Sequence, residues 1–64
     1  MYGVKDIIKL FNSYADEYFE TFTPRDELCK MFVTLFGTKP DSNLSKETLI
    51  MILRNKVKEV SYGQ

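Results

Sequence analysis

Two pairs of adjacent carboxylates and one thiol are the side chains of this chain that come closest to a catalytic or metal-binding set. The pairs are Asp16-Glu17 and Asp26-Glu27, and the thiol is Cys29. Neighbouring residues of a helix point about 100° apart, so each pair suits a solvated face better than a dyad that shares a proton. The chain has no histidine, so Cys29 has no partner for a thiolate–imidazolium pair or a zinc site.

The three glycines are too far apart to build a phosphate-binding loop. They stand at positions 3, 37 and 63, whereas such loops need several glycines within a few residues. Because the general base, the metal ligands and the phosphate loop are all missing, we expect a non-enzymatic protein. The expectation includes no catalytic residue, no metal, no cofactor and no small-molecule substrate.

Composition indicates one small folded domain spanning residues 1–64. The 64 residues are 44% hydrophobic and 14% aromatic, which is too apolar for disorder, but a chain of this size buries only a thin core. A single cysteine excludes an internal disulfide and favours a reducing, cytoplasmic compartment. The longest apolar run, residues 49–53, is far shorter than the roughly 20 residues that span a bilayer, so we expect no membrane association.

Apolar residues recur at the helical period in three segments, which predict helices over residues 3–22, 24–36 and 46–60. In the first helix the expected core-facing stripe consists of Val4, Ile7, Ile8, Phe11, Ala15, Tyr18 and Phe22, widened by Leu10, Tyr14 and Phe19. The stripe of the second helix is Leu28, Met31, Phe32 and Leu35, and that of the third is Leu49, Ile50, Leu53, Val57 and Val60. No alternating strand pattern occurs, so the predicted fold is an all-α three-helix bundle.

Start and stop signals support the second and third helices. Pro24 suits a first helical position after a Thr23 cap, and Gly37 suits the left-handed residue that ends many helices. A cluster of turn-forming residues follows in the 38–44 loop, and Ser45 is placed to cap the third helix.

The third helix carries more apolar side chains than one core-facing stripe needs. Met51 points about 160° away from the stripe, and Ile52 lies about 100° from it. Arg54 and Lys58 flank Met51 on this outer face, and Tyr14 adds an aromatic ring from the first helix. We hypothesise a partner-binding surface of these five residues, for a protein partner or a second copy of the chain. Small neutral domains of this kind suit regulatory inhibitors or adaptors encoded by phages and mobile elements.

The stretch from residue 23 to residue 53, TPRDELCKMFVTLFGTKPDSNLSKETLIMIL, contains a helix, a polar loop and a second helix. The first helix opens with Asp26-Glu27-Leu28 and ends at Gly37, and the second opens with Ser45-Lys46-Glu47-Thr48-Leu49-Ile50. This pattern resembles the helix, extended loop, helix modules of the SAP, Rho-N and HeH groups, and it covers about half of the chain. Members of these groups often bind nucleic acid through the loop and the start of the second helix. The resemblance implies that role for Lys39, Ser42, Ser45 and Lys46.

Charge leaves both hypotheses open. The chain has nine basic and nine acidic residues, so no overall field attracts a polyanion. The first 22 residues have a net charge of −2 and the remainder +2, and much of the basic charge lies on the third helix. A protein-interaction module is the first hypothesis. The alternative is a nucleic-acid-binding accessory module that uses the 38–46 loop and the basic residues of the third helix, with Lys39, Lys46, Arg54 and Lys58 as the contacts. Phosphate-driven binding would fall steeply with salt, whereas an apolar protein interface would hardly change.

Overall fold

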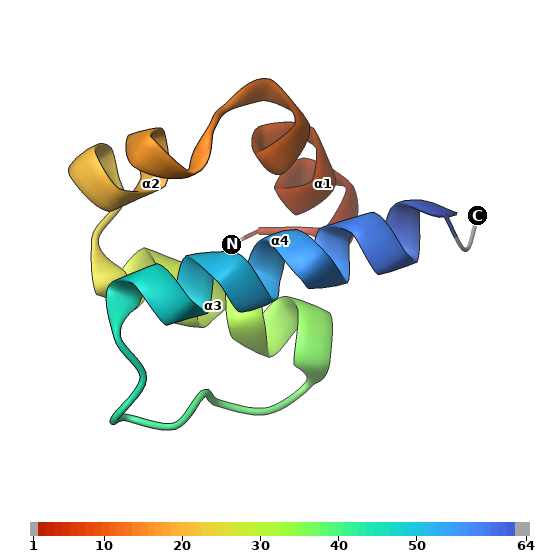
Figure 1. Cartoon of the computed structure of the whole chain (residues 1–64). Helices are drawn as coiled ribbons and strands as arrows, with labels where there is room; N and C mark the ends of the chain where they lie inside the picture. The colour runs from red at the N-terminus through yellow and green to blue at the C-terminus, as the bar shows by residue number, and fades with distance from the viewer. Residues whose placement is uncertain (1, 63–64) are drawn as a thin grey trace.

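The computed structural model describes residues 2–62, which form four helices and no strand (Figure 1). The helices are α1 (Val4–Ser13), α2 (Asp16–Phe22), α3 (Arg25–Phe36) and α4 (Lys46–Tyr62). The fold is therefore all-α, as predicted. The predicted count of three helices is wrong, because the 3–22 segment forms two helices instead of one. Within the described residues, no helix has both the length and the apolarity needed to cross a bilayer.

The break in the first predicted helix lies at Tyr14 and Ala15. Both residues have extended backbones, with ψ angles of 146° and 168°. Just before the break, the hydroxyl of Ser13 donates to the carbonyl of Lys9 at 2.8 Å, a side-chain bond that often accompanies a bend in a helix. The bend turns α2 away from the axis of α1, so residues 16–22 no longer continue the stripe that begins at Val4.

This change of direction decides which aromatic side chain of α2 enters the core. A continuous helix would point Tyr18 and Phe22 inward, together with Ile7 and Phe11. In the structure Phe19 is the buried residue of α2, and Phe22 is 70% exposed. The predicted stripe is therefore wrong at Phe22, whereas Tyr18 is half-buried against the core and Phe19, expected at the edge of the stripe, is fully buried.

Helix α4 is the central element of the fold. It packs against α1, α2 and α3, and in Figure 1 α1 and α2 lie above it while α3 runs behind and below it. The buried core consists of Ile7, Phe11, Phe19, Leu28, Met31, Leu49, Ile50, Leu53 and Val57. Four of these residues belong to the predicted α4 stripe, and the fifth member of that stripe, Val60, is half-buried.

The ends of α3 and α4 follow the local signals in most respects. Gly37 ends α3 in the left-handed conformation, with φ of 76°. The hydroxyl of Ser45 accepts the backbone N–H of Thr48 at 3.1 Å, so Ser45 caps α4 as predicted. The predicted Thr23 cap is wrong: Pro24 occupies the position before α3 and Thr23 ends α2.

Candidate functional site

A row of stacked aromatic side chains lies on the surface of α2 and the junction before it. The rings of Tyr14 and Tyr18 stack with centroids 4.0 Å apart, and the rings of Tyr18 and Phe22 lie 5.4 Å apart. Tyr14 is 43% exposed and Phe22 is 70% exposed. These three residues, called the aromatic row below, form a continuous apolar surface that reaches solvent.

Tyr2 extends the aromatic row toward α3. With Leu10 and Tyr14 it lines a hollow of about 460 Å³ beside α1, whose other lining residues are Asp6, Lys9 and Ser13. The pKa of Tyr2 is raised, chiefly because its hydroxyl hydrogen-bonds to the Glu27 carboxylate, with smaller effects from burial and from the nearby Tyr18. Tyr2, which precedes α1, therefore lies near Glu27 of α3 and lines the same hollow as Tyr14 of the aromatic row.

The aromatic row is exposed because α2 is the least covered helix. Among the described helices the backbone of α2 lies close to α4 alone, whereas the backbones of α1 and α3 each lie close to two others. Phe19 is the buried side chain of α2, and its ring stacks on that of Phe11 in α1 with centroids 4.2 Å apart. At about 100° per residue, Tyr18 and Phe22 lie together on one flank of Phe19. Nothing in the described part of the chain covers that flank as a helix would.

The opposite flank of α2 carries carboxylates. Asp16 and Glu20 lie about 60° and 100° from Phe19, and Glu17 about 160°. Helix α2 has no basic residue. Asp16 is paired with Arg54, but neither glutamate takes part in the three ion pairs found among the described residues. The uncovered surface of α2 therefore has an aromatic side and an acidic side.

Arg54 does not point outward with Met51 as its helical position suggested. Its guanidinium donates to the carbonyls of Phe11 at 3.0 Å and Tyr14 at 2.8 Å, and its Nε bonds the Asp16 carboxylate. The guanidinium also lies over the Phe11 ring, 5.2 Å from the centroid. Arg54 thus binds the end of α1 and the start of α2 at once. Its guanidinium is engaged in contacts within this chain.

The other residues of the hypothesised α4 surface stay together. Met51 is 55% exposed, Lys58 is exposed, and Ile52 is half-buried. Tyr14 does not join them: its ring stacks on α2, and none of the described residues that line the hollow beside it belongs to α4. The five residues predicted as one surface are therefore divided. Met51, Ile52 and Lys58 lie on α4, Tyr14 lies against α2, and Arg54 binds the α1–α2 junction.

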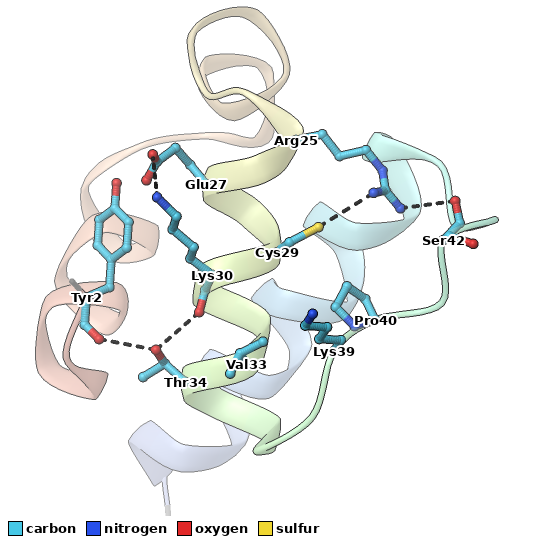
Figure 2. A pocket seen from close by; sticks show the side chains of 10 residues that line it. All are labelled: Tyr2, Arg25, Glu27, Cys29, Lys30, Val33, Thr34, Lys39, Pro40 and Ser42. Atoms are coloured by element: carbon cyan, nitrogen blue, oxygen red, sulfur yellow. Dashed lines mark hydrogen bonds and ion pairs between the residues drawn. The ribbon is translucent and has the colours of Figure 1, made fainter.

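The residues of the nucleic-acid alternative are also divided. Lys39 and Ser42 are exposed on the loop after α3, where both line a groove of about 820 Å³ along that helix (Figure 2). Ser45 is occupied as the cap of α4, and the ammonium of Lys46 donates to the Glu20 carbonyl at 2.6 Å. Two of the four polar groups therefore have partners within the fold.

The same groove shows how the loop is held. Arg25 donates to the carbonyls of Asp41, Ser42 and Leu44 at 3.3, 3.4 and 3.0 Å, and Figure 2 shows its guanidinium between this loop and Cys29. A second nitrogen of the guanidinium lies 3.5 Å from the Cys29 sulfur. The groove is thus shaped by one arginine that fastens the loop against α3.

Reasoning from the sequence missed Tyr2 and Phe22 as surface residues. Tyr2 lay outside every predicted stripe, and Phe22 was assigned to the core together with Tyr18, which is half-buried there. The available signal was the pair Asn12-Ser13, because both residues have low helix propensity and compete for backbone hydrogen bonds. A helix end at that pair would have moved Phe22 away from the core.

No family model matches this chain, and searches of characterised proteins and of solved structures find no significant match. The side chains and their geometry are therefore what supports a functional proposal.

Proposed function

We propose that this protein is a non-enzymatic protein-interaction module that binds its partner through the aromatic row. The observation that carries the proposal is Phe22, which is 70% exposed although its ring lies against that of Tyr18, on the helix whose backbone has the fewest helix neighbours. Large aromatic side chains are enriched among the residues that dominate binding energy at protein interfaces. A stacked row of them offers such anchors already positioned on the fold.

The expected gain from covering Phe22 is substantial for so small a protein. Fully burying a phenylalanine side chain contributes about 1.5 to 3 kcal/mol, and Phe22 has most of its surface available for that. Stacking on Tyr18 and Tyr14 holds the rings in place before binding, which lowers the entropy cost of ordering them. A short helix such as α2 would itself gain stability from a second packing partner.

The outer face of α4 supports the proposal less strongly. Met51 is exposed there, but its helical neighbours Glu47, Asn55 and Lys58 are polar and exposed, so it is a single apolar side chain in a solvated face. The nucleic-acid alternative has less support still, because Arg54 and Lys46 donate to backbone carbonyls of this chain. A regulatory adaptor or inhibitor is the kind of protein that such a compact docking surface would serve.

Site-specific photo-crosslinking tests the proposal. p-Benzoylphenylalanine is placed at position 22, which changes one exposed aromatic ring to another, and in a matched protein at position 55 on the outer face of α4. Ultraviolet irradiation in the cells that make the protein should give one discrete protein adduct from position 22, and excess unmodified protein should suppress it. Adducts from position 55 alone, or from neither position, would contradict the proposal.

A further inference from the structure

We propose that the partner presents a basic amphipathic helix, which lies along α2 with its apolar side on the aromatic row and its Lys or Arg side chains against the α2 carboxylates. The inference rests on the proposed function and adds the chemistry of the partner. It follows from the division of the uncovered surface of α2 into an aromatic side and an acidic side.

The arrangement of the two sides is suited to a helix laid alongside. Around the axis of α2 the exposed order is Glu20, Glu17, Thr21, Tyr18 and Phe22, so a single threonine separates acid from aromatic. A partner helix with one apolar stripe and one flanking basic stripe would meet both sides at once. A wholly apolar partner would leave the two glutamates at the edge of a dry contact, which is unfavourable.

The helix dipole accounts for only part of the acidic side. Asp16 and Glu17 lie in the first turn of α2, where carboxylates are stabilised by the positive end of the dipole. Glu20 lies near the C-terminal end of α2, where a carboxylate is disfavoured, and Lys46 reaches its backbone carbonyl. The carboxylates of Glu17 and Glu20 are in no ion pair among the described residues, although the Lys46 ammonium lies beside the Glu20 backbone, and they are complementary to a cationic partner.

Aromatic rings add a second attraction for cations. A guanidinium or ammonium over a ring face is stabilised by the ring quadrupole, and this fold already uses that contact twice. Arg54 lies 5.2 Å from the centroid of Phe11, and Lys56 lies 5.4 Å from that of Phe36. The ring of Phe22, which is 70% exposed, is open to the same contact from a partner.

Two synthetic peptides test the inference directly. Both are fluorescein-labelled amphipathic helices of about 18 residues with the same leucine stripe. The polar side of one peptide carries Lys, and that of the other carries Glu. Fluorescence anisotropy should show binding of the Lys peptide and at least tenfold weaker binding of the Glu peptide. The substitution Phe22→Ser should weaken binding of the Lys peptide by about thirtyfold.

Glutamate-to-glutamine substitutions remove the negative charge of α2 without changing side-chain size, so they test the basic character of the partner separately from its apolar side. The pair Glu17→Gln with Glu20→Gln should weaken binding of the Lys peptide by about tenfold, whereas Glu47→Gln on the outer face of α4 should leave it unchanged. Circular dichroism of each variant checks that it retains the helical fold. Equal binding of both peptides, no loss in the double variant, or binding of neither peptide would overturn the inference.

Two further results separate this inference from the proposed function. If the unliganded protein forms dimers that Phe22→Ser abolishes in analytical ultracentrifugation, a second copy covers α2 and the inference is overturned. If photo-crosslinking at position 22 gives a discrete protein adduct while neither peptide binds, the proposed function stands and only the basic helix is rejected.

Discussion

Two connections in this fold are held by the same device. At the α1–α2 junction Arg54 donates to the carbonyls of Phe11 and Tyr14. In the loop between α3 and α4, Arg25 donates to the carbonyls of Asp41, Ser42 and Leu44. In both, a guanidinium from a helix binds backbone oxygens in or beside the segment that connects two helices.

The two connections differ in what else holds them. The loop has its own turn residues: Gly37 adopts φ of 76°, and the Asp41 carboxylate accepts the Asn43 N–H at 2.9 Å. The junction has neither glycine nor proline and depends on Arg54, which also binds Asp16. The comparison teaches that a bend can be specified locally or from a distant helix, and that the second kind is the more vulnerable to a single substitution.

The largest effect is therefore expected for Arg54→Met, which keeps a long apolar side chain and removes every donor. The carbonyls of Phe11 and Tyr14 lose a charged partner, and we expect a loss of about 2 kcal/mol in the free energy of unfolding. For a domain of this size that lowers the melting temperature by about 10 °C, measurable by circular dichroism. The control Lys58→Met, on the same helix, should change stability by less than about 0.5 kcal/mol. Equal stability of the two variants would contradict the claim that the α1–α2 junction depends on Arg54.

A smaller effect is expected where the loop depends on its own backbone. Gly37→Ala forces a side chain into the left-handed region, at a cost of about 1 to 2 kcal/mol. A Cβ at this position meets nothing within 4 Å, so the cost comes from the backbone conformation alone. Gly37→Asn should cost less than Gly37→Ala in the same urea titration, because asparagine tolerates this conformation better. A greater loss for asparagine than for alanine would contradict a backbone origin.

The smallest effect is expected for Arg25→Met. The carbonyls of Asp41 and Ser42 are exposed, so water can replace the arginine there, and we expect a loss of less than about 1 kcal/mol. The change should appear locally, as faster hydrogen exchange of the Leu44 amide, which donates to the Asp41 carbonyl at 3.2 Å. The Leu53 amide in the core of α4 serves as the control and should exchange at an unchanged rate. A loss as large as that of Arg54→Met would show that both connections depend equally on their arginines.

The same contrast explains which parts of the structure could be predicted. The buried faces of α3 and α4, the Gly37 end and the Ser45 cap follow from signals within a few residues of each element. The bend at Tyr14 has only a weak local signal, the low helix propensity of Asn12 and Ser13, because the periodicity continues across it and its stabilising arginine lies 40 residues further along the chain. The predicted partner-binding surface did not include Phe22 for the same reason, since that side chain was assigned to the core of a continuous helix.

The reach of Arg54 also has a consequence for the order in which the protein folds. The contacts that bend the first segment join residues separated by 38 to 43 positions, so they form only after α4 has docked. Until then, residues 3–22 retain the local preference for one continuous helix that their periodicity encodes. We therefore expect the late stages of folding to include a rearrangement in which arrival of the C-terminal helix breaks a non-native helix in two, and Phe22 to take its place outside the core only in that final step.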